Sequence, residues 1–127
     1  MQMKYLIIDD NPDIQKLIRQ EVCTEGDTII ECADGEDALH EYANHLPDLV
    51  LMDIKMNKVN GITATKMIRE KFPDANIIII TNYNTPAFRT AAKQAGAIAF
   101  VPKENLIEVK NFINLTLNKL TRKIEKI

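Results

Sequence analysis

Five short apolar runs alternate along the chain with longer segments in which apolar residues recur at helical spacing. The runs are rich in isoleucine, leucine and valine, and they predict β-strands at residues 4–9, 28–32, 48–53, 76–81 and 97–101. The first, third and fourth runs are almost continuously apolar, which is typical of strands that are covered on both faces in a parallel sheet. The pattern therefore predicts a sheet that is buried between helices.

The segments between these strands predict helices that are apolar on one side. Their apolar stripes are formed by Ile14, Leu17, Ile18 and Val22; by Ala38, Leu39, Tyr42 and Ala43; by Met67, Ile68 and Phe72; and by Phe88, Ala91, Ala92 and Ala95. A fifth helix is predicted to begin near Glu104. This alternation predicts an α/β fold of the doubly wound (βα)5 type, a five-stranded parallel sheet with helices on both faces. Such folds bind ligands beyond the carboxyl ends of their strands.

Composition and charge narrow the class of protein. At 127 residues, with 46% hydrophobic and 27% charged residues, the chain has the size and composition of one globular domain. The net charge is −2; five basic against two acidic residues give +3 between 106 and 127, which leaves −5 elsewhere. We therefore expect no direct nucleic-acid binding by this domain. Cys23 and Cys32 lack the number and spacing of a disulfide framework or a metal site, and we assign them no chemistry.

Neither a membrane span nor a signal peptide is predicted from the sequence. No apolar run approaches the ~18 residues that a membrane span needs. The first residues lead directly into a short strand-like run, without the apolar segment and cleavage site of a signal peptide. We expect a cytoplasmic protein that does not associate with membranes.

Polar residues stand at the carboxyl ends of four predicted strands. Asp9 and Asp10 end the first strand, Asp53 the third and Thr81 the fourth, and Lys103 follows the fifth. Each residue alone has an ordinary structural explanation; Asp10, for example, is suited to cap the following helix. Together, three carboxylates at one edge repel one another unless a cation lies among them. Oxygen ligands without histidine or cysteine favour Mg²⁺.

A divalent cation at this edge would permit phosphoryl chemistry. A carboxylate whose charge is neutralised in this way can attack phosphorus as a nucleophile. Phosphoryl transfer also needs positive charge and hydrogen-bond donors on the phosphoryl oxygens. Besides the cation, the ammonium group of Lys103 and the hydroxyl group of Thr81 are the donors that the sequence offers.

The residues at the strand ends form an ordered set of motifs. They are the pair Asp9-Asp10 with Pro12 close behind, Asp53 in LVLMDIKM, Gly61 eight residues later, Thr81 after four isoleucines, and Lys103 shortly after AFV. With these motifs, residues 4 to about 118 resemble a response-regulator receiver domain of bacterial two-component signalling, the CheY-like family. The resemblance implies a flavodoxin-like fold. It also implies a signalling domain that is not an enzyme, apart from its own phosphorylation and dephosphorylation.

The resemblance also implies a role for each matching residue. Asp53 is the expected phosphoacceptor, and Lys103 is expected to hold a phosphoryl oxygen. Asp10 and Asp53 are expected to bind Mg²⁺ directly, together with the backbone carbonyl of Lys55, whereas Asp9 is expected to act through a water molecule. The phosphoryl donor is then a sensor histidine kinase or a histidine phosphotransfer protein.

A second set of expectations concerns the response to phosphorylation. Thr81 is expected to move toward the phosphoryl group, and Phe100 occupies the position of the family's aromatic switch. The altered surface comprises the fourth helix, fifth strand and fifth helix, and it contacts an output domain or target protein. The commonest form of the family has proline after the lysine, joined by a cis bond, whereas Glu104 follows Lys103 here. A cis bond to Glu104 would cost ~2.5–4 kcal/mol, and a lysine without the trailing proline resembles receivers with LuxR-type outputs.

Two other functions fit parts of the pattern. A Mg²⁺-dependent phosphohydrolase also works through an aspartyl phosphate, but that class resembles D-x-D around the nucleophile, and Lys55 stands at the second position. A flavodoxin-like cofactor binder needs a phosphate-binding loop after its first strand, where Asp9 and Asp10 would repel a phosphate. Multiple turnover on a small phosphate ester would favour the first alternative, and a bound coloured cofactor the second.

The end of the chain continues the apolar pattern beyond the expected domain. Leu106, Val109, Ile113, Leu117, Leu120, Ile124 and Ile127 are spaced three or four residues apart. A helix over 104–127 is about 36 Å long, whereas strands of five or six residues span ~20 Å. We therefore predict a receiver domain at 1–118 and an overhanging connector or dimerisation segment at 119–127. The alternative is that the last turns fray.

Overall fold

The computed structural model describes the backbone of residues 2–125 and the side chains of residues 2–115 and 118. Five strands and five helices alternate along it. The strands are β1 (Lys4–Ile8), β2 (Thr28–Cys32), β3 (Leu49–Met52), β4 (Ile77–Thr81) and β5 (Ala99–Pro102), and the helices are α1 (Pro12–Val22), α2 (Gly35–His45), α3 (Gly61–Lys71), α4 (Pro86–Ala95) and α5 (Ile107–Glu125). The (βα)5 prediction is confirmed, with most strand ends shifted by one or two residues.

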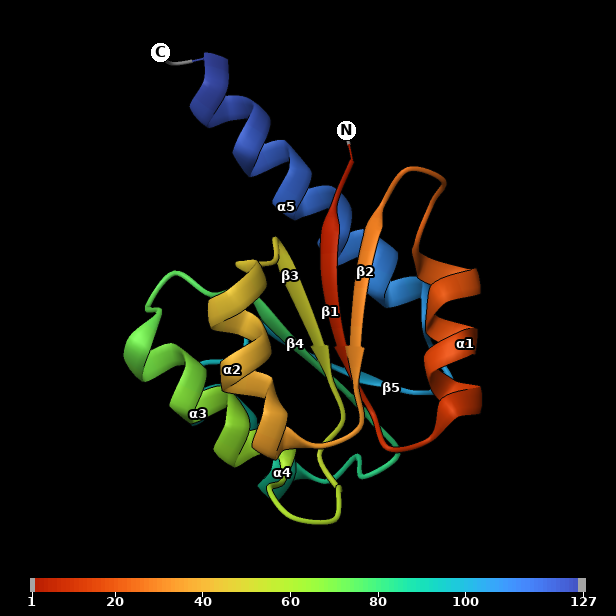
Figure 1. Cartoon of the computed structure of the whole chain (residues 1–127), viewed down its shortest axis with the longest axis vertical. Helices are drawn as coiled ribbons and strands as arrows, with labels where there is room; N and C mark the ends of the chain where they lie inside the picture. The colour runs from red at the N-terminus through yellow and green to blue at the C-terminus, as the bar shows by residue number, and fades with distance from the viewer. Residues whose placement is uncertain (1, 126–127) are drawn as a thin grey trace.

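All neighbouring strands pair in parallel, in the order β2-β1-β3-β4-β5. The helices cover both faces of this twisted sheet (Figure 1). The strand order reverses around β1, so the ends of β1 and β3 flank the point where doubly wound folds place a ligand. β1 and β3 are in register there, with Ile8 opposite Met52.

Two apolar layers hold the helices on the sheet, one on each face. Successive side chains of a strand point to opposite faces, which is why the isoleucines of β4 divide between the layers. Ile77 and Ile79 pack beneath α2, α3 and α4. Ile78 and Ile80 pack beneath α1 and α5. An uninterrupted apolar run is therefore what a strand covered on both faces requires.

The helices begin at polar caps and end where the backbone changes direction. Asn11, Asp34, Asn60 and Thr85 each accept a backbone N–H from the first turn of the helix that follows. Gly96 ends α4 with φ of 105°, a left-handed conformation that glycine adopts without strain. The turn agrees with the predicted end of the fourth helix.

Helix α5 begins at Ile107, three residues later than predicted. The amide side chain of Asn105 donates to Glu108 Oε1 at 2.9 Å, and a turn precedes the helix. The later turns of α5 run beyond the edge of the sheet (Figure 1). The side chains of Leu117, Leu120 and Ile124, and Ile127 entirely, lie outside the described residues. The division at residue 118 and the pairing role of the end segment therefore stay predictions.

Candidate functional site

Three aspartates meet at the carboxyl edge of the sheet. Asp9 directly follows β1 and Asp53 directly follows β3, so the pairing of these two strands brings them together. Each of Asp9, Asp10 and Asp53 offers a carboxylate oxygen, and these oxygens all lie within 4.8 Å of one another. Asp9 and Asp53 are 1% and 5% exposed, whereas Asp10 is exposed. The predicted acidic cluster thus has two buried members and one that faces solvent.

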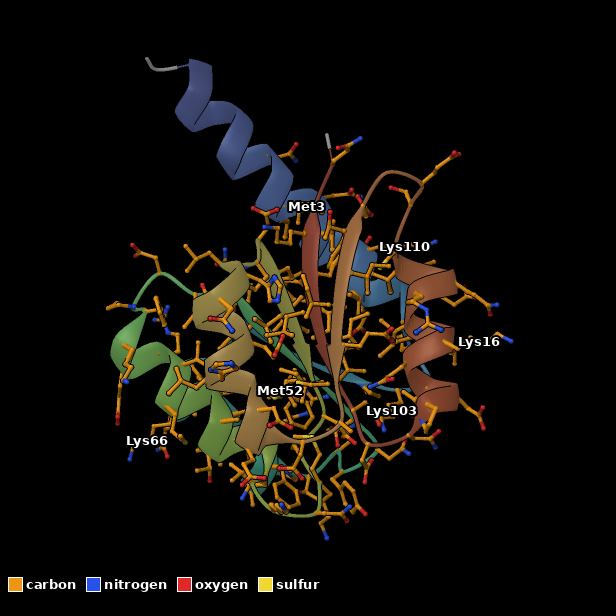
Figure 2. The ribbon with its side chains drawn as sticks, in the orientation of Figure 1. Met3, Lys16, Met52, Lys66, Lys103 and Lys110 are labelled. Carbon is orange, nitrogen blue, oxygen red and sulfur yellow. The ribbon has the colours of Figure 1, made fainter. Side chains whose placement is uncertain are left out.

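A single lysine reaches both buried aspartates. Lys103 Nζ lies 2.9 Å from Asp9 Oδ2 and 3.0 Å from Asp53 Oδ2. Figure 2 labels Lys103 near the end of the sheet at which Met52 closes β3. One ammonium against three carboxylates leaves the cluster with a formal charge of −2. The cluster therefore retains negative charge that a cation can neutralise.

Burial and neighbouring charges alter the ionisation of Asp9 and Lys103. Burial raises the pKa of Asp9 above its usual value and the Asp53 carboxylate adds to this, although the Asn11 N–H and the Lys103 ammonium oppose it. Burial alone lowers the pKa of Lys103, but its contacts with Asp9 and Asp53 raise the net pKa. Lys103 accordingly stays protonated at neutral pH.

Local hydrogen bonds give the three carboxylates different surroundings. Asp9 Oδ1 accepts the Asn11 N–H at 2.9 Å, and Asp53 Oδ1 accepts the Ile54 N–H at 2.8 Å. The side chain of Asn11, not that of Asp10, caps α1, so the alternative explanation of Asp10 as the cap is wrong. Within the described part of the chain, Asp10 makes no side-chain hydrogen bond or ion pair. Its carboxylate is available to a ligand.

Gly61 closes the loop that follows Asp53. Its N–H donates to the Ile54 carbonyl at 2.7 Å. A Cβ atom at position 61 would lie 1.8 Å from the backbone oxygen of Asp53, a separation that no side chain tolerates. The glycine in the sequence motif is therefore explained by close backbone packing behind the aspartate.

Thr81 lies at the same edge, one strand further along. It is fully buried, and its Oγ1 accepts the Tyr83 N–H at 3.2 Å. Its backbone carbonyl accepts the Lys103 N–H at 3.1 Å, which ties the end of β4 to the loop of the lysine. The structure thus places Thr81 beside the cluster, with its hydroxyl engaged in its own loop.

Phe100 lies in β5. Its ring packs against the core beneath α2, α3 and α4, and the Arg89 guanidinium lies 4.9 Å from the ring centroid. Lys55 is exposed, and its ammonium lies 4.3 Å from the centroid of the Tyr83 ring. Neither cation–π contact was predicted from the sequence, because each joins residues that lie on different segments of the chain.

Sequence reasoning also missed Asp34. Its carboxylate caps α2 and accepts backbone N–H groups of Lys58 and Val59, which are 24 and 25 residues away. The only local signal was an aspartate that precedes a predicted helix, a position at which a cap is ordinary.

The remaining features concern the peptide bond after Lys103, the two cysteines and membrane association. No described peptide bond is cis, so the bond between Lys103 and Glu104 is trans. Burial is the main factor that raises the pKa of Cys23 to about 11 and that of Cys32 to about 12, so both thiols are protonated at neutral pH. A helix with the length and apolar character needed to cross a bilayer does not occur in the described range.

The doubly wound sheet and the acidic cluster at its carboxyl edge define an α/β domain with a candidate divalent-cation site. A family model for the response regulator receiver domain matches residues 5–113, and the chain belongs to this family. The chemotaxis protein CheY of Bacillus subtilis (strain 168) is 35% identical over 120 residues, which cover 93% of this chain and 100% of that protein. The predicted family is confirmed.

Two further relatives extend the comparison. YhcZ of Bacillus subtilis (strain 168), an uncharacterized transcriptional regulatory protein, is 39% identical over 104 residues, 80% of this chain and 49% of that protein. The crystal structure of a two-component response regulator of the LuxR family from Aurantimonas sp. SI85-9A1 has a TM-score of 0.80 at 28% identity and covers 89% of this chain and 85% of that chain. The chain spans about half the length of the first curated relatives that it matches. The comparisons give no support to the phosphohydrolase alternative.

Proposed function

We propose that this receiver domain accepts a phosphoryl group on Asp53, in a Mg²⁺-dependent reaction with a sensor histidine kinase or a histidine phosphotransfer protein as donor. The observation that supports this proposal most directly is the position of the Asp53 carboxylate. Its Oδ2 contacts Lys103 Nζ at 3.0 Å, and its oxygens lie within 4.8 Å of those of Asp9 and Asp10. Asp9 also contacts Lys103 and lies in the same cluster, but Asp53 follows β3, the central strand of the sheet, in the motif that matches the phosphoacceptor position of the family.

The donor set suits Mg²⁺. Three carboxylates without histidine or cysteine form a hard, all-oxygen site. Asp10, which is exposed and unpaired among the described residues, would bind directly, as would Asp53 and the backbone carbonyl of Lys55. Asp9 is already held by Asn11 and Lys103, which favours contact through water. The cation would neutralise the negative charge that otherwise repels a phosphoryl donor.

Asp53 and Lys103 would take part in the transfer of the phosphoryl group. Asp53 Oδ1 is fixed by the Ile54 N–H, so Oδ2 would act as the nucleophile. The new O–P bond forms as the N–P bond to the donor histidine breaks, and the donor nitrogen retains the electron pair. Lys103 would then leave the carboxylate and hold a phosphoryl oxygen. The product is an aspartyl phosphate, and the domain acts as a signalling phosphoacceptor, not as a turnover enzyme.

Thr81 and Phe100 would report the modification. The Thr81 oxygen accepts a hydrogen bond from Tyr83, which leaves its hydroxyl hydrogen available for a phosphoryl oxygen. The movement of Thr81 toward the phosphoryl group would let the Phe100 ring move relative to Arg89 and to the core. The resulting change would alter the surface of α4, β5 and α5, where an output domain or target protein binds.

The output supported best is control of transcription. One relative is named as an uncharacterized transcriptional regulatory protein and one structural neighbour as a LuxR-family response regulator. The lysine without a trailing proline also resembles receivers with LuxR-type outputs. DNA contact would then belong to another domain and not to this one. We assign residues 1–118 to the receiver and residues 119–127 to a connector or homodimer contact, supported by the continuation of α5 past the sheet (Figure 1).

Intact-mass spectrometry tests the phosphoacceptor. Incubation with acetyl phosphate and Mg²⁺ is expected to add one phosphoryl group to the wild type, and none to Asp53→Asn or to an EDTA-treated sample. Asp48→Asn is the matched control, because Asp48 precedes the same strand β3 at the opposite edge. Labelling of Asp53→Asn would contradict the proposal. Sustained hydrolysis of a small phosphate ester by the wild type would instead favour the phosphohydrolase.

A further inference from the structure

Asp34 joins two segments beside the acidic cluster. It lies two residues after β2 and caps α2, where its Oδ1 accepts the Glu36 N–H at 2.9 Å. The same oxygen accepts the Val59 N–H at 2.9 Å, and Oδ2 accepts the Lys58 N–H at 2.9 Å. Hydrogen bonds to a charged acceptor are stronger than neutral ones. One carboxylate therefore fixes the loop between β3 and α3 against the start of α2.

The backbone of the two segments is also in close contact. The Gly35 N–H donates to the Val59 carbonyl at 3.2 Å. A Cβ atom at position 35 would lie 2.4 Å from that carbonyl oxygen, so only glycine permits the approach. Lys58 and Glu36 form an ion pair at 3.2 Å, but both side chains are more than half exposed, and such pairs contribute little. Met56 and Val59 of the loop also pack against the core beneath α2 and α3, and the carboxylate of Asp34 adds hydrogen bonds to the loop backbone.

The charge state of Asp34 agrees with this role. Desolvation alone would raise its pKa, but the backbone N–H groups of Glu36, Lys58, Val59 and Asn57 outweigh that effect and lower the pKa below its usual value. The carboxylate is therefore ionised at neutral pH, as an acceptor of several N–H groups must be.

The loop has a second anchor at its other end. Gly61 N–H binds the Ile54 carbonyl at 2.7 Å, and Gly61 packs against the backbone oxygen of Asp53. Residues 55–57 lie between the strand end and the segment that Asp34 holds. This stretch includes Lys55, whose backbone carbonyl is the proposed Mg²⁺ ligand. The Lys55 side chain is exposed and lies over the Tyr83 ring, so the position of its carbonyl depends on these two anchors and on the packing of Met56 against the core.

We propose that Asp34 is a positioning residue for the divalent cation: by holding Lys58 and Val59, it keeps the loop in the conformation that presents the Lys55 carbonyl. The inference rests on the proposed Mg²⁺ site. A ligand that is already ordered loses less conformational entropy on binding. Groups that orient metal ligands typically contribute about tenfold or more to affinity. We expect the loss of Asp34 to raise the Mg²⁺ dissociation constant by about tenfold.

Two substitutions separate the loop contacts from the helix cap. Serine is as good a cap as aspartate but is too short to reach the loop, so Asp34→Ser keeps the bond to Glu36 and loses those to Lys58 and Val59. Asparagine keeps both Oδ1 bonds and loses only the bond to Lys58, because its amide group is a donor. Calorimetric titration with Mg²⁺ alone is expected to rank the affinities as wild type, then Asp34→Asn, then Asp34→Ser.

Asp27→Ser supplies the matched control. Asp27 also joins two segments, since it accepts the Met3 N–H at 2.9 Å and the Thr24 N–H at 2.8 Å, but it does so at the opposite edge of the sheet. We expect Asp27→Ser to lower stability and to leave the Mg²⁺ affinity unchanged. At saturating Mg²⁺, Asp34→Ser is expected to reach the wild-type extent of phosphorylation, which general loss of folding would not allow.

Amide hydrogen exchange distinguishes the outcomes. Faster exchange at Lys58 and Val59 in Asp34→Ser, together with weaker Mg²⁺ binding, supports the proposal. Faster exchange with unchanged Mg²⁺ affinity overturns it and leaves the proposed function intact. Absence of Mg²⁺ binding by the wild type itself contradicts the proposed function as well as the inference. If Asp34→Ser does not fold, the test uses Asp34→Asn instead. A Mg²⁺ affinity of Asp34→Asn equal to that of the wild type then overturns the proposal.

Discussion

Both edges of the sheet carry aspartates, but the partners of these aspartates differ. At the amino edge, where Figure 2 labels Met3, Asp27 accepts the Met3 N–H at 2.9 Å and Asp48 accepts the Lys4 N–H at 2.8 Å. At the carboxyl edge, Asp9 and Asp53 share the single ammonium of Lys103. Aspartates that are matched by backbone N–H groups hold loops together. Three clustered aspartates with one ammonium among them keep net negative charge for a cation and a nucleophile.

The largest expected effect comes from removal of the one ammonium at the carboxyl edge. Lys103→Ala should slow phosphorylation by acetyl phosphate about a hundredfold or more, because loss of one donor to a developing negative charge has effects of this size. Phosphoprotein formed over time, measured by intact mass, checks this. Lys110→Ala is the control, since Lys110 is an exposed lysine of α5 that faces the amino-edge pocket with Met3. A wild-type rate in Lys103→Ala would contradict the assigned role.

The next effect distinguishes the aspartates within the cluster. Asp10→Ala should weaken Mg²⁺ binding by about tenfold or more and by more than Asp9→Ala, because Asp10 has no competing partner among the described residues and Asp9 is held by Asn11 and Lys103. In EDTA, Asp10→Ala should also melt at a higher temperature than the wild type, because one of three mutually repelling carboxylates is gone. Calorimetry and thermal unfolding measure the two quantities.

Either of two results would contradict this account of the cluster. Equal Mg²⁺ affinities for Asp9→Ala and Asp10→Ala would remove the distinction between contact through water and direct contact. A lower melting temperature of Asp10→Ala in EDTA would show that Asp10 stabilises the fold and is not held in place for a cation.

A moderate effect is expected at Thr81, which should separate phosphorylation from the response. Thr81→Ala keeps the strand packed and is expected to accept a phosphoryl group from acetyl phosphate, while the amide NMR shifts of α4 no longer change as in the wild type. Thr65→Ala is a suitable control, because Thr65 is also fully buried and donates its hydroxyl group to the Gly61 carbonyl. A wild-type response of α4 in Thr81→Ala would exclude Thr81 from the switch.

The smallest effect on the chemistry is expected at the amino edge. Asp27→Asn should lower the free energy of unfolding by about 1 kcal/mol, the typical value of a hydrogen bond, because one carboxylate oxygen that accepts a backbone N–H becomes a donor. Its phosphorylation rate should equal that of the wild type. Denaturant unfolding and the acetyl phosphate assay measure these quantities, and a slower phosphorylation would show that the two edges are coupled.

The sequence was sufficient for the parts of the fold that depend on periodic burial. The four isoleucines of β4 divide between two apolar layers, and such runs are readable because a buried strand needs apolar residues on both sides. The ends of elements were less predictable. The predicted strands included Asp9 and Asp53, whereas the observed strands stop one residue earlier and leave both carboxylates beyond the ladder.

The same contrast holds for the site. Asp9, Asp10, Asp53 and Lys103 were predictable because parallel strands bring their carboxyl ends to one edge, and the structure brings these four together. The role of Asp34 was not predictable, because its contacts reach 24 and 25 residues along the chain to backbone groups. Backbone N–H groups are present at nearly every residue, so the sequence carries no pattern that marks which of them a carboxylate will bind.

The most direct test of the account is the position of the phosphoryl group in the wild-type protein. Borohydride reduces an aspartyl phosphate to homoserine, so reduction after treatment with acetyl phosphate and Mg²⁺, followed by peptide sequencing in a mass spectrometer, identifies the modified residue. Homoserine is expected at position 53 and at no other aspartate of either edge. Homoserine at position 9 or 10, or at the amino-edge positions 27 or 48, would contradict the claim that Asp53 is the nucleophile of the carboxyl edge.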